Sequence, residues 1–233
     1  MKKTSVFFLL ICLALIQTGY ADDEISPIDW NNIGVTLFSE GRYSEAIAAY
    51  QNVTRNNPDD ARAWGNIGLA LASQGENEEA LAAFNKTVRL NPSDALAWSN
   101  MGLVLNNLGR YSEALDAYER SLSLKPDIAR TITNQGLTFH NLGKEEEALG
   151  AYEKATILDP GYGSAWRNMG SALNNLGRYE EAIVACEKAI AIQPDDAPAY
   201  TTKSQALKSL GKNDQATLAA EKASEIYKRY EEQ

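Results

Sequence analysis

The sequence predicts an all-α protein, a right-handed α-solenoid of antiparallel helix pairs stacked in tandem. Three observations lead to this fold class. Prolines recur at a constant interval of 34 residues, at Pro58, Pro92, Pro126, Pro160 and Pro194. A glycine and an alanine recur at fixed places between these prolines, and apolar residues follow a helical spacing on both sides of the glycine. One helix pair cannot bury its apolar face alone, whereas stacked pairs can.

Alignment on the prolines divides the chain into six repeats of 34 residues. They are residues 27–60, 61–94, 95–128, 129–162, 163–196 and 197–230. The fourth residue is tryptophan in four repeats: Trp30, Trp64, Trp98 and Trp166. The fifteenth is glycine in all six: Gly41, Gly75, Gly109, Gly143, Gly177 and Gly211. The twentieth is alanine in all six: Ala46, Ala80, Ala114, Ala148, Ala182 and Ala216.

Each repeat predicts two helices. In residues 61–94, Trp64, Ile67 and Leu71 share one helical face, and a second apolar stripe follows Gly75. The glycine permits the left-handed turn between antiparallel helices, and the proline near the end of the repeat stops the second helix. Three aspartates stand where they would cap the following helix: Asp60, Asp94 and Asp196.

This register resembles the tetratricopeptide repeat (TPR), whose pattern is Trp-x-x-Leu-Gly-x-x-Tyr, then Ala-x-x-x-Phe, then Pro. The third repeat matches it with Trp98, Met101, Gly102, Leu105, Ala114, Tyr118 and Pro126. The resemblance covers residues 27 to about 230 and implies that the first helix of each repeat lines a concave groove. The last repeat departs from the pattern at Lys203, Ser204 and Lys228. We therefore expect it to cap the array, because terminal repeats face water.

The first 21 residues have the features of a secretory signal peptide. Lys2 and Lys3 precede an apolar run over residues 6–16, and the small residues Gly19 and Ala21 then frame a cleavage site before Asp22. We expect a short linker over residues 22–26, a TPR domain over residues 27–233, and a location outside the cytoplasm, periplasmic or secreted. The run is too short to span a bilayer, so a retained anchor is the weaker alternative and no membrane insertion is expected after cleavage.

The charge balance excludes some classes of partner. The formal net charge is −9, and removal of Lys2 and Lys3 with the signal peptide makes it −11. Nucleic acids and anionic lipids require a positive surface, so neither is an expected partner. Cleavage also leaves Cys186 as the single cysteine, which excludes an internal disulfide. It occupies a place where other repeats have Tyr or Phe, so we expect a small buried core residue.

No catalytic constellation is visible. The chain has one histidine, His140, and after cleavage one cysteine, which is too few for a metal site of such ligands. A phosphate-binding Gly-x-x-x-x-Gly-Lys-Ser/Thr stretch and a Gly-x-Ser-x-Gly nucleophile elbow are both missing from the sequence. We therefore expect a protein without enzymatic activity, cofactor or metal.

The candidate binding residues lie on the first helices. The sixth residue is asparagine in five consecutive repeats: Asn32, Asn66, Asn100, Asn134 and Asn168. An amide both donates and accepts, so such a ladder can pair with the backbone of an extended peptide. The resemblance also implies inward-facing cationic or titratable side chains: Arg62, Arg130, Arg167, Lys208 and His140. The alternative is that these groups are only solvated surface, with the amides unused.

The leading interpretation is a non-catalytic protein-interaction scaffold that binds an extended peptide or a partner protein in its groove. The alternative is a structural subunit of a cell-envelope assembly that uses its acidic second helices or the solenoid ends. A small-molecule or glycan binder is a third hypothesis. Two glycosylation sequons are present, at Asn52 and Asn85. The sequence leaves the oligomeric state open, since repeat ends can stack.

Overall fold

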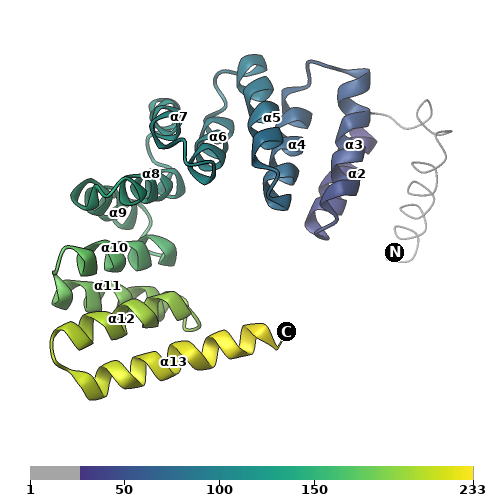
Figure 1. Cartoon of the computed structure of the whole chain (residues 1–233). Helices are drawn as coiled ribbons and strands as arrows, with labels where there is room; N and C mark the ends of the chain where they lie inside the picture. Colours follow the sequence, from purple (N-terminus) through teal and green to yellow (C-terminus); the bar gives the residue numbers. More distant parts are fainter. Residues whose placement is uncertain (1–26, 233) are drawn as a thin grey trace. The chain divides into compact units, whose positions relative to one another are not determined.

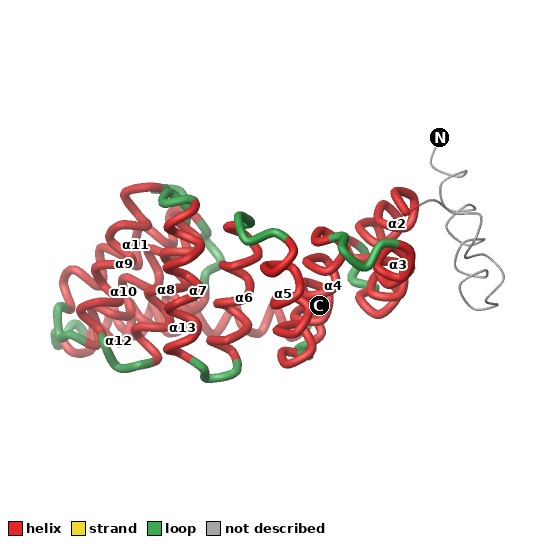
Figure 2. Tube along the Cα trace, turned by 90° about the horizontal axis from the view of Figure 1, so that it is seen from above, coloured by secondary structure: helices red, strands yellow, loops and turns green. Residues whose placement is uncertain are grey.

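The computed structural model describes residues 27–232. Within this range it consists of α-helices joined by short turns and contains no β-strand (Figures 1 and 2). The expected signal peptide and linker lie outside the described residues. The helices are α2 (Pro27–Ser39), α3 (Tyr43–Asn56), α4 (Ala61–Gln74), α5 (Asn77–Leu90), α6 (Ala95–Asn107), α7 (Tyr111–Leu124), α8 (Ala129–Asn141), α9 (Glu145–Leu158), α10 (Gly163–Asn175), α11 (Tyr179–Ile192), α12 (Ala197–Ser209) and α13 (Asn213–Glu231). The predicted all-α fold of tandem antiparallel helix pairs is confirmed.

The chain divides after Gly109 into two compact parts. The N-terminal part comprises α2 to α6, and the C-terminal part comprises α7 to α13. Consecutive helices pack against each other within each part, and α10 also lies beside both α8 and α12. Within each part, first helices of successive repeats are therefore neighbours, as a stack of helix pairs requires.

The glycines and aspartates act as the sequence predicts. All six turn glycines have positive φ, between 72° for Gly143 and 82° for Gly75, a conformation that side chains with a Cβ atom rarely adopt. Three aspartate side chains cap helices: Asp60 accepts from the Ala63 N–H, Asp94 from those of Leu96 and Ala97, and Asp196 from that of Ala199.

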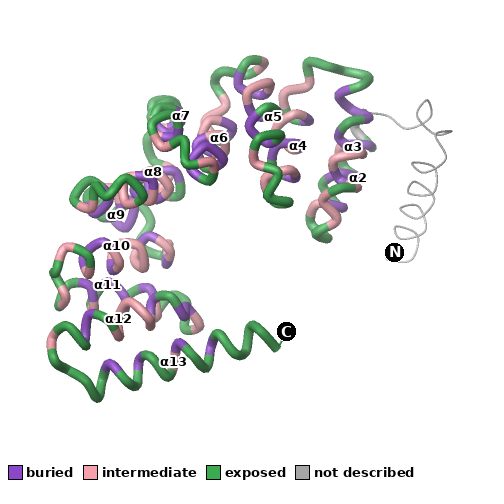
Figure 3. Tube along the Cα trace, in the orientation of Figure 1, coloured by how far each residue is buried: buried purple, intermediate pink, exposed green. Residues whose placement is uncertain are grey.

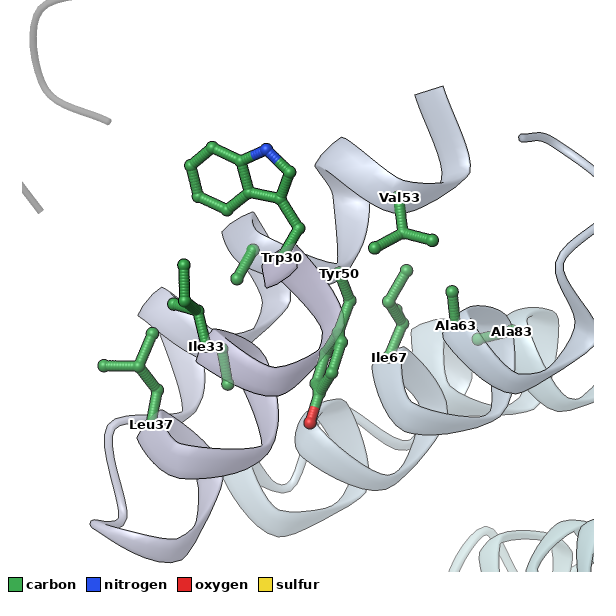
Figure 4. Packing of buried hydrophobic residues seen from close by; sticks show 10 residues of the cluster. Trp30, Ile33, Leu37, Tyr50, Val53, Ala63, Ile67 and Ala83 are labelled. Atoms are coloured by element: carbon green, nitrogen blue, oxygen red, sulfur yellow. The ribbon is translucent and has the colours of Figure 1, made fainter. Parts of the chain in front are cut away.

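In the first, second and fourth repeats an aromatic ring of the second helix packs onto a glycine of the first helix. A Cβ atom added to Gly68 would lie 3.0 Å from the Phe84 ring, and one added to Gly136 would lie 2.7 Å from Cε1 of Tyr152. The two rings are almost fully buried. Figure 4 shows the equivalent Tyr50 side chain between Ile33 of α2 and Ile67 of α4, so the ring joins one repeat to the next. Glycine is required here because the helices approach closely.

Cys186 takes the place of the ring in the fifth repeat and is fully buried with a free thiol. A Cβ atom on Gly170 would lie 2.7 Å from its Sγ atom, so the shorter side chain still fills the space. Burial raises the pKa of the Cys186 thiol to about 12. The prediction of a small core residue is confirmed.

The last helix pair lacks both partners of this packing. Ser204 replaces the glycine and donates its hydroxyl to the Ala216 carbonyl at 2.7 Å, and Ala220 replaces the ring and is exposed. The last helix, α13, has 19 residues and is exposed along most of its length (Figure 3). This agrees with a capping role for the final repeat.

The tryptophans differ from one another in burial. Trp30 is fully buried, whereas Trp64, Trp98 and Trp166 are half-buried. Each of these three donates its indole N–H to the carbonyl of the proline six residues earlier, at 2.9–3.0 Å. The indole therefore also holds the turn that precedes its own helix, and its polar edge stays near the surface.

Candidate functional site

The five candidate asparagines occupy the same position on five first helices. Asn32, Asn66 and Asn100 lie on α2, α4 and α6, and Asn134 and Asn168 lie on α8 and α10. Asn32 is exposed and the other four are half-buried. Their equivalent helical positions place them on the same face of each first helix, which we call the first-helix face. The N-terminal and C-terminal parts each have such a face.

A direct contact joins the second member of this series to Asn31, the neighbour of the first member on α2. The Asn66 amide donates from Nδ2 to Oδ1 of Asn31 at 3.2 Å, which links α4 to α2 across the first-helix face. Within residues 27–232, the side chains of Asn32, Asn100, Asn134 and Asn168 make no hydrogen bond to the protein. Their amide groups are available to a ligand.

Three of the candidate cationic or titratable groups are exposed, and two have partners inside the protein. Arg62 on α4 and Arg130 on α8 are exposed, as is Lys208 on α12. Arg167 on α10 instead donates from Nη1 to Oδ2 of Asp196 at 3.1 Å. The Asp196 side chain is 1% exposed. A buried carboxylate needs a compensating partner, so Arg167 stabilises the aspartate that caps α12.

His140 belongs to a small polar network between α8, α9 and α10. Its Nδ1 atom lies 2.9 Å and 3.0 Å from the two carboxylate oxygens of Glu145. Glu145 also accepts a hydrogen bond from Nδ2 of Asn175 at 2.9 Å. His140 and Arg167 can therefore bind a ligand only if they share or break their contacts with Glu145 and Asp196. Arg62 and Arg130 have no ion pair to break among the described residues.

Sequence reasoning missed a row of exposed aliphatic side chains on the first-helix face. Val35, Leu69 and Leu103 are the ninth residues of the first three repeats, and all three are exposed. The signal was present in the 34-residue register, where the fourth repeat continues the series with Leu137. Leucine on a helix ordinarily indicates core, and only the structure separates these side chains from the buried ones.

Other kinds of site have little support among residues 27–232. No group of three or more His, Cys, Asp or Glu side chains there is placed to hold a metal ion. In the same range, no helix combines the length and the apolar character needed to cross a membrane. The C-terminal part has an open cleft of about 480 Å³ between α12 and α13 and one of about 530 Å³ between α11, α12 and α13.

The two sequons differ in accessibility. Asn52 is 6% exposed, and its Oδ1 atom accepts a hydrogen bond from Nη1 of Arg55 at 2.7 Å. Asn85 is half-buried. Since a glycan needs a surface position, the folded chain presents Asn52 poorly for modification.

Comparison with known proteins agrees with this architecture. Tetratricopeptide repeat models match residues 31–95, 95–128, 129–162, 163–196 and 197–230. No curated protein sequence matched the chain.

Among solved structures, MamA is 26% identical, with a TM-score of 0.63 over 71% of this chain and 96% of that chain. YrrB, described as a TPR protein with an unusual peptide-binding site, is 25% identical, with a TM-score of 0.60 over 79% of this chain and 95% of that chain. PilF of Pseudomonas aeruginosa is 19% identical, with a TM-score of 0.76 over 86% of this chain and 91% of that chain, a likeness of fold alone.

Proposed function

The chain belongs to the tetratricopeptide repeat family, and on this premise we propose that it is an exported, non-catalytic scaffold whose first-helix faces bind an extended peptide segment of a partner protein. Repeats of this family make scaffolds for protein–protein interaction. The finer proposal concerns which face binds, what it binds and where. The observation that supports it best is the series of five asparagines on consecutive first helices.

The chemistry of the amides fits an extended backbone. Each asparagine can donate to a peptide carbonyl and accept from a peptide N–H, and neither bond depends on the ligand's side chains. An extended segment leaves its backbone groups free, whereas a helix has already paired most of them internally. One amide per repeat therefore favours a ligand that crosses successive helices. The description of YrrB as a TPR protein with a peptide-binding site supports a peptide as the ligand.

Charge adds a preference for carboxylates. Arg62 and Arg130 are exposed on the first helices, and each can donate a bidentate pair of hydrogen bonds to a carboxylate. His140 and Arg167 remain candidates, but Glu145 and Asp196 already hold them. We expect their contribution to binding to be smaller than that of the two exposed arginines.

Removal of two ladder amides tests the proposal. The purified chain with Asn100→Ala and Asn134→Ala is compared with the unmodified chain for capture of proteins from an extracytoplasmic fraction, quantified by mass spectrometry. Each lost hydrogen bond costs about 0.5–1.5 kcal/mol, so the double substitution should weaken capture roughly 5- to 150-fold. Asn56→Ala, an exposed amide at the end of α3, is the matched control and should leave capture unchanged. Equal capture by all three proteins would show that the amides do not bind the partner.

Export is tested separately, by fractionation. We expect the chain to be recovered outside the cytoplasm and to begin at or near Asp22 when its N-terminus is sequenced. A product in the cytoplasmic fraction that retains Met1 would exclude an exported scaffold.

The second candidate is a structural subunit of an envelope assembly, favoured by the exposed carboxylates on α9. Glu146, Glu147 and Glu153 all face solvent on this second helix. If they form the contact, Glu146→Lys with Glu147→Lys should abolish co-purification of the assembly while the asparagine variant leaves it intact. The opposite pattern would favour the first-helix face.

A further inference from the structure

The N-terminal part concentrates its exposed apolar side chains on one face. In residues 29–109, the four large apolar side chains that are exposed all lie on first helices. They are Val35 at 49%, Leu69 at 37%, Leu96 at 52% and Leu103 at 36% exposure. The second helices α3 and α5 have none in this range. Single exposed leucines are ordinary on a protein surface. Four exposed apolar side chains that all lie on one face indicate a binding surface.

Three of these side chains stand beside the amides. Val35, Leu69 and Leu103 each follow a ladder asparagine by three residues, a spacing that makes the two side chains neighbours on a helix. The pairs are Asn32 with Val35, Asn66 with Leu69, and Asn100 with Leu103. We call these six residues the amide–aliphatic surface. It lies entirely within the N-terminal part.

The surface has little charge. The three helices that form it, α2, α4 and α6, contain two charged residues, Asp29 and Arg62. By contrast α5 alone contains Glu78, Glu79, Lys86 and Arg89. A ligand complementary to this surface is therefore largely uncharged, with apolar side chains and a carboxylate tolerated near Arg62.

The spacing of the helices sets the spacing of the ligand's side chains. Helices in contact have axes about 8–10 Å apart. Here α2 and α4 touch through Asn31 and Asn66, and α4 packs beside α6. An extended chain advances about 3.1–3.4 Å per residue, so one step from helix to helix corresponds to about three residues. Residues three apart point the same way in a polyproline II conformation and opposite ways in a β-strand.

We propose, building on the function proposed above, that the amide–aliphatic surface binds an extended peptide of polyproline II type with an apolar side chain at every third residue. The aliphatic side chains contact these residues, and the asparagines pair with the backbone groups between them. A polyproline II segment has no internal hydrogen bonds, so its carbonyl and N–H groups are available to the amides. A second copy of this chain would present helices, whose backbone groups are mostly paired already.

The C-terminal part provides an internal comparison. The positions equivalent to the aliphatic row are Leu137, which is half-buried, then Ser171 and Gln205. The row of apolar side chains therefore ends after Leu137, whereas the row of asparagines continues as far as Asn168. Selection for apolar side chains should come from the first three repeats.

Fluorescently labelled ten-residue peptides test the inference directly. One peptide has leucine at positions 2, 5 and 8 in a background of serine, glutamine and proline. Its partner has the same composition with leucine at positions 2, 4 and 6. Binding to the purified chain is measured by fluorescence anisotropy. We expect the peptide with three-residue spacing to bind at least tenfold more tightly, and Leu69→Ser and Val35→Ser each to remove most of that preference.

Leu218→Ser is the control variant, because Leu218 is 65% exposed on α13 in the C-terminal part. It should leave the preference unchanged, and circular dichroism melting verifies that each variant is folded. Equal affinity for the two peptides, or no binding of either, would overturn the inference. If Asn100→Ala weakens two equally bound peptides alike, the proposed function stands and only the apolar spacing is wrong. Loss of the preference in Leu218→Ser as well would also overturn it.

Discussion

Substitution of two helical glycines by alanine should have opposite effects on stability. Gly136 on α8 is buried, and a Cβ atom there would lie 2.7 Å from Cε1 and 3.0 Å from Cδ1 of Tyr152. Gly150 on α9 is exposed, and a Cβ atom there would meet nothing within 4 Å. The same added methyl group would therefore collide with a ring at Gly136 and contact nothing at Gly150.

The expected magnitudes follow from two effects. Alanine is favoured over glycine inside a helix by about 1 kcal/mol, which applies to both sites. Overpacking a closed core costs about 1–3 kcal/mol, which applies only to Gly136, because the Tyr152 ring is 1% exposed and has no free space to enter. Gly150→Ala should thus stabilise by about 1 kcal/mol. Gly136→Ala should be about 1–3 kcal/mol less stable than Gly150→Ala.

Urea unfolding followed by circular dichroism measures the difference. A third variant, Tyr152→Ala, isolates its cause, because the ring that collides is then missing. In that background Gly136→Ala should no longer destabilise, giving a coupling free energy of about 1–3 kcal/mol between the two sites. Equal stabilities for the two alanine variants, or an unchanged cost of Gly136→Ala without the ring, would refute the packing of ring on glycine.

Three further predictions concern the turns, caps and thiol. Gly75→Ala should destabilise by about 1–3 kcal/mol through backbone strain, since φ is 82° and no atom obstructs the Cβ; a melting temperature at or above that of the unmodified chain would contradict this. Asp94→Ala should cost about 0.5–2 kcal/mol as a lost cap, and Asp196→Ala more, because it also removes the partner of Arg167; urea midpoints in the reverse order would refute this. The Cys186 thiol, with its pKa raised to about 12, should resist iodoacetamide at pH 8 until urea unfolds the chain, and rapid labelling of the folded protein would disprove its burial.

Much of the fold could be predicted because its determinants are local and repeated. A glycine that ends one helix and an aspartate that begins the next act within a few residues of themselves, so Gly75 and Asp60 could be assigned from spacing alone. The 34-residue register then places the remaining helices. Cys186 could be assigned to the core by the same comparison of equivalent positions.

The site was less predictable because it depends on neighbours outside the local sequence. Arg167 was expected to face a ligand, and the structure shows it bonded to Asp196, 29 residues later. That contact exists only because α12 packs beside α10. His140 likewise meets Glu145 across a turn. The 34-residue register cannot distinguish the exposed Leu69 from the buried Ile67, because both positions hold apolar residues in several repeats.

Ser204 and Ala220 of the final helix pair affect where a further repeat could pack against this chain. A duplicate of residues 163–196 inserted after residue 196 would pack on each side against a repeat of the kind that residues 163–196 already contact. A duplicate added beyond α13 would instead adjoin Ser204 and Ala220, with no bulky group to bridge the new joint. A repeat added inside the array would therefore keep the usual packing at both of its joints, whereas a repeat added after α13 would have no aromatic ring at the new joint.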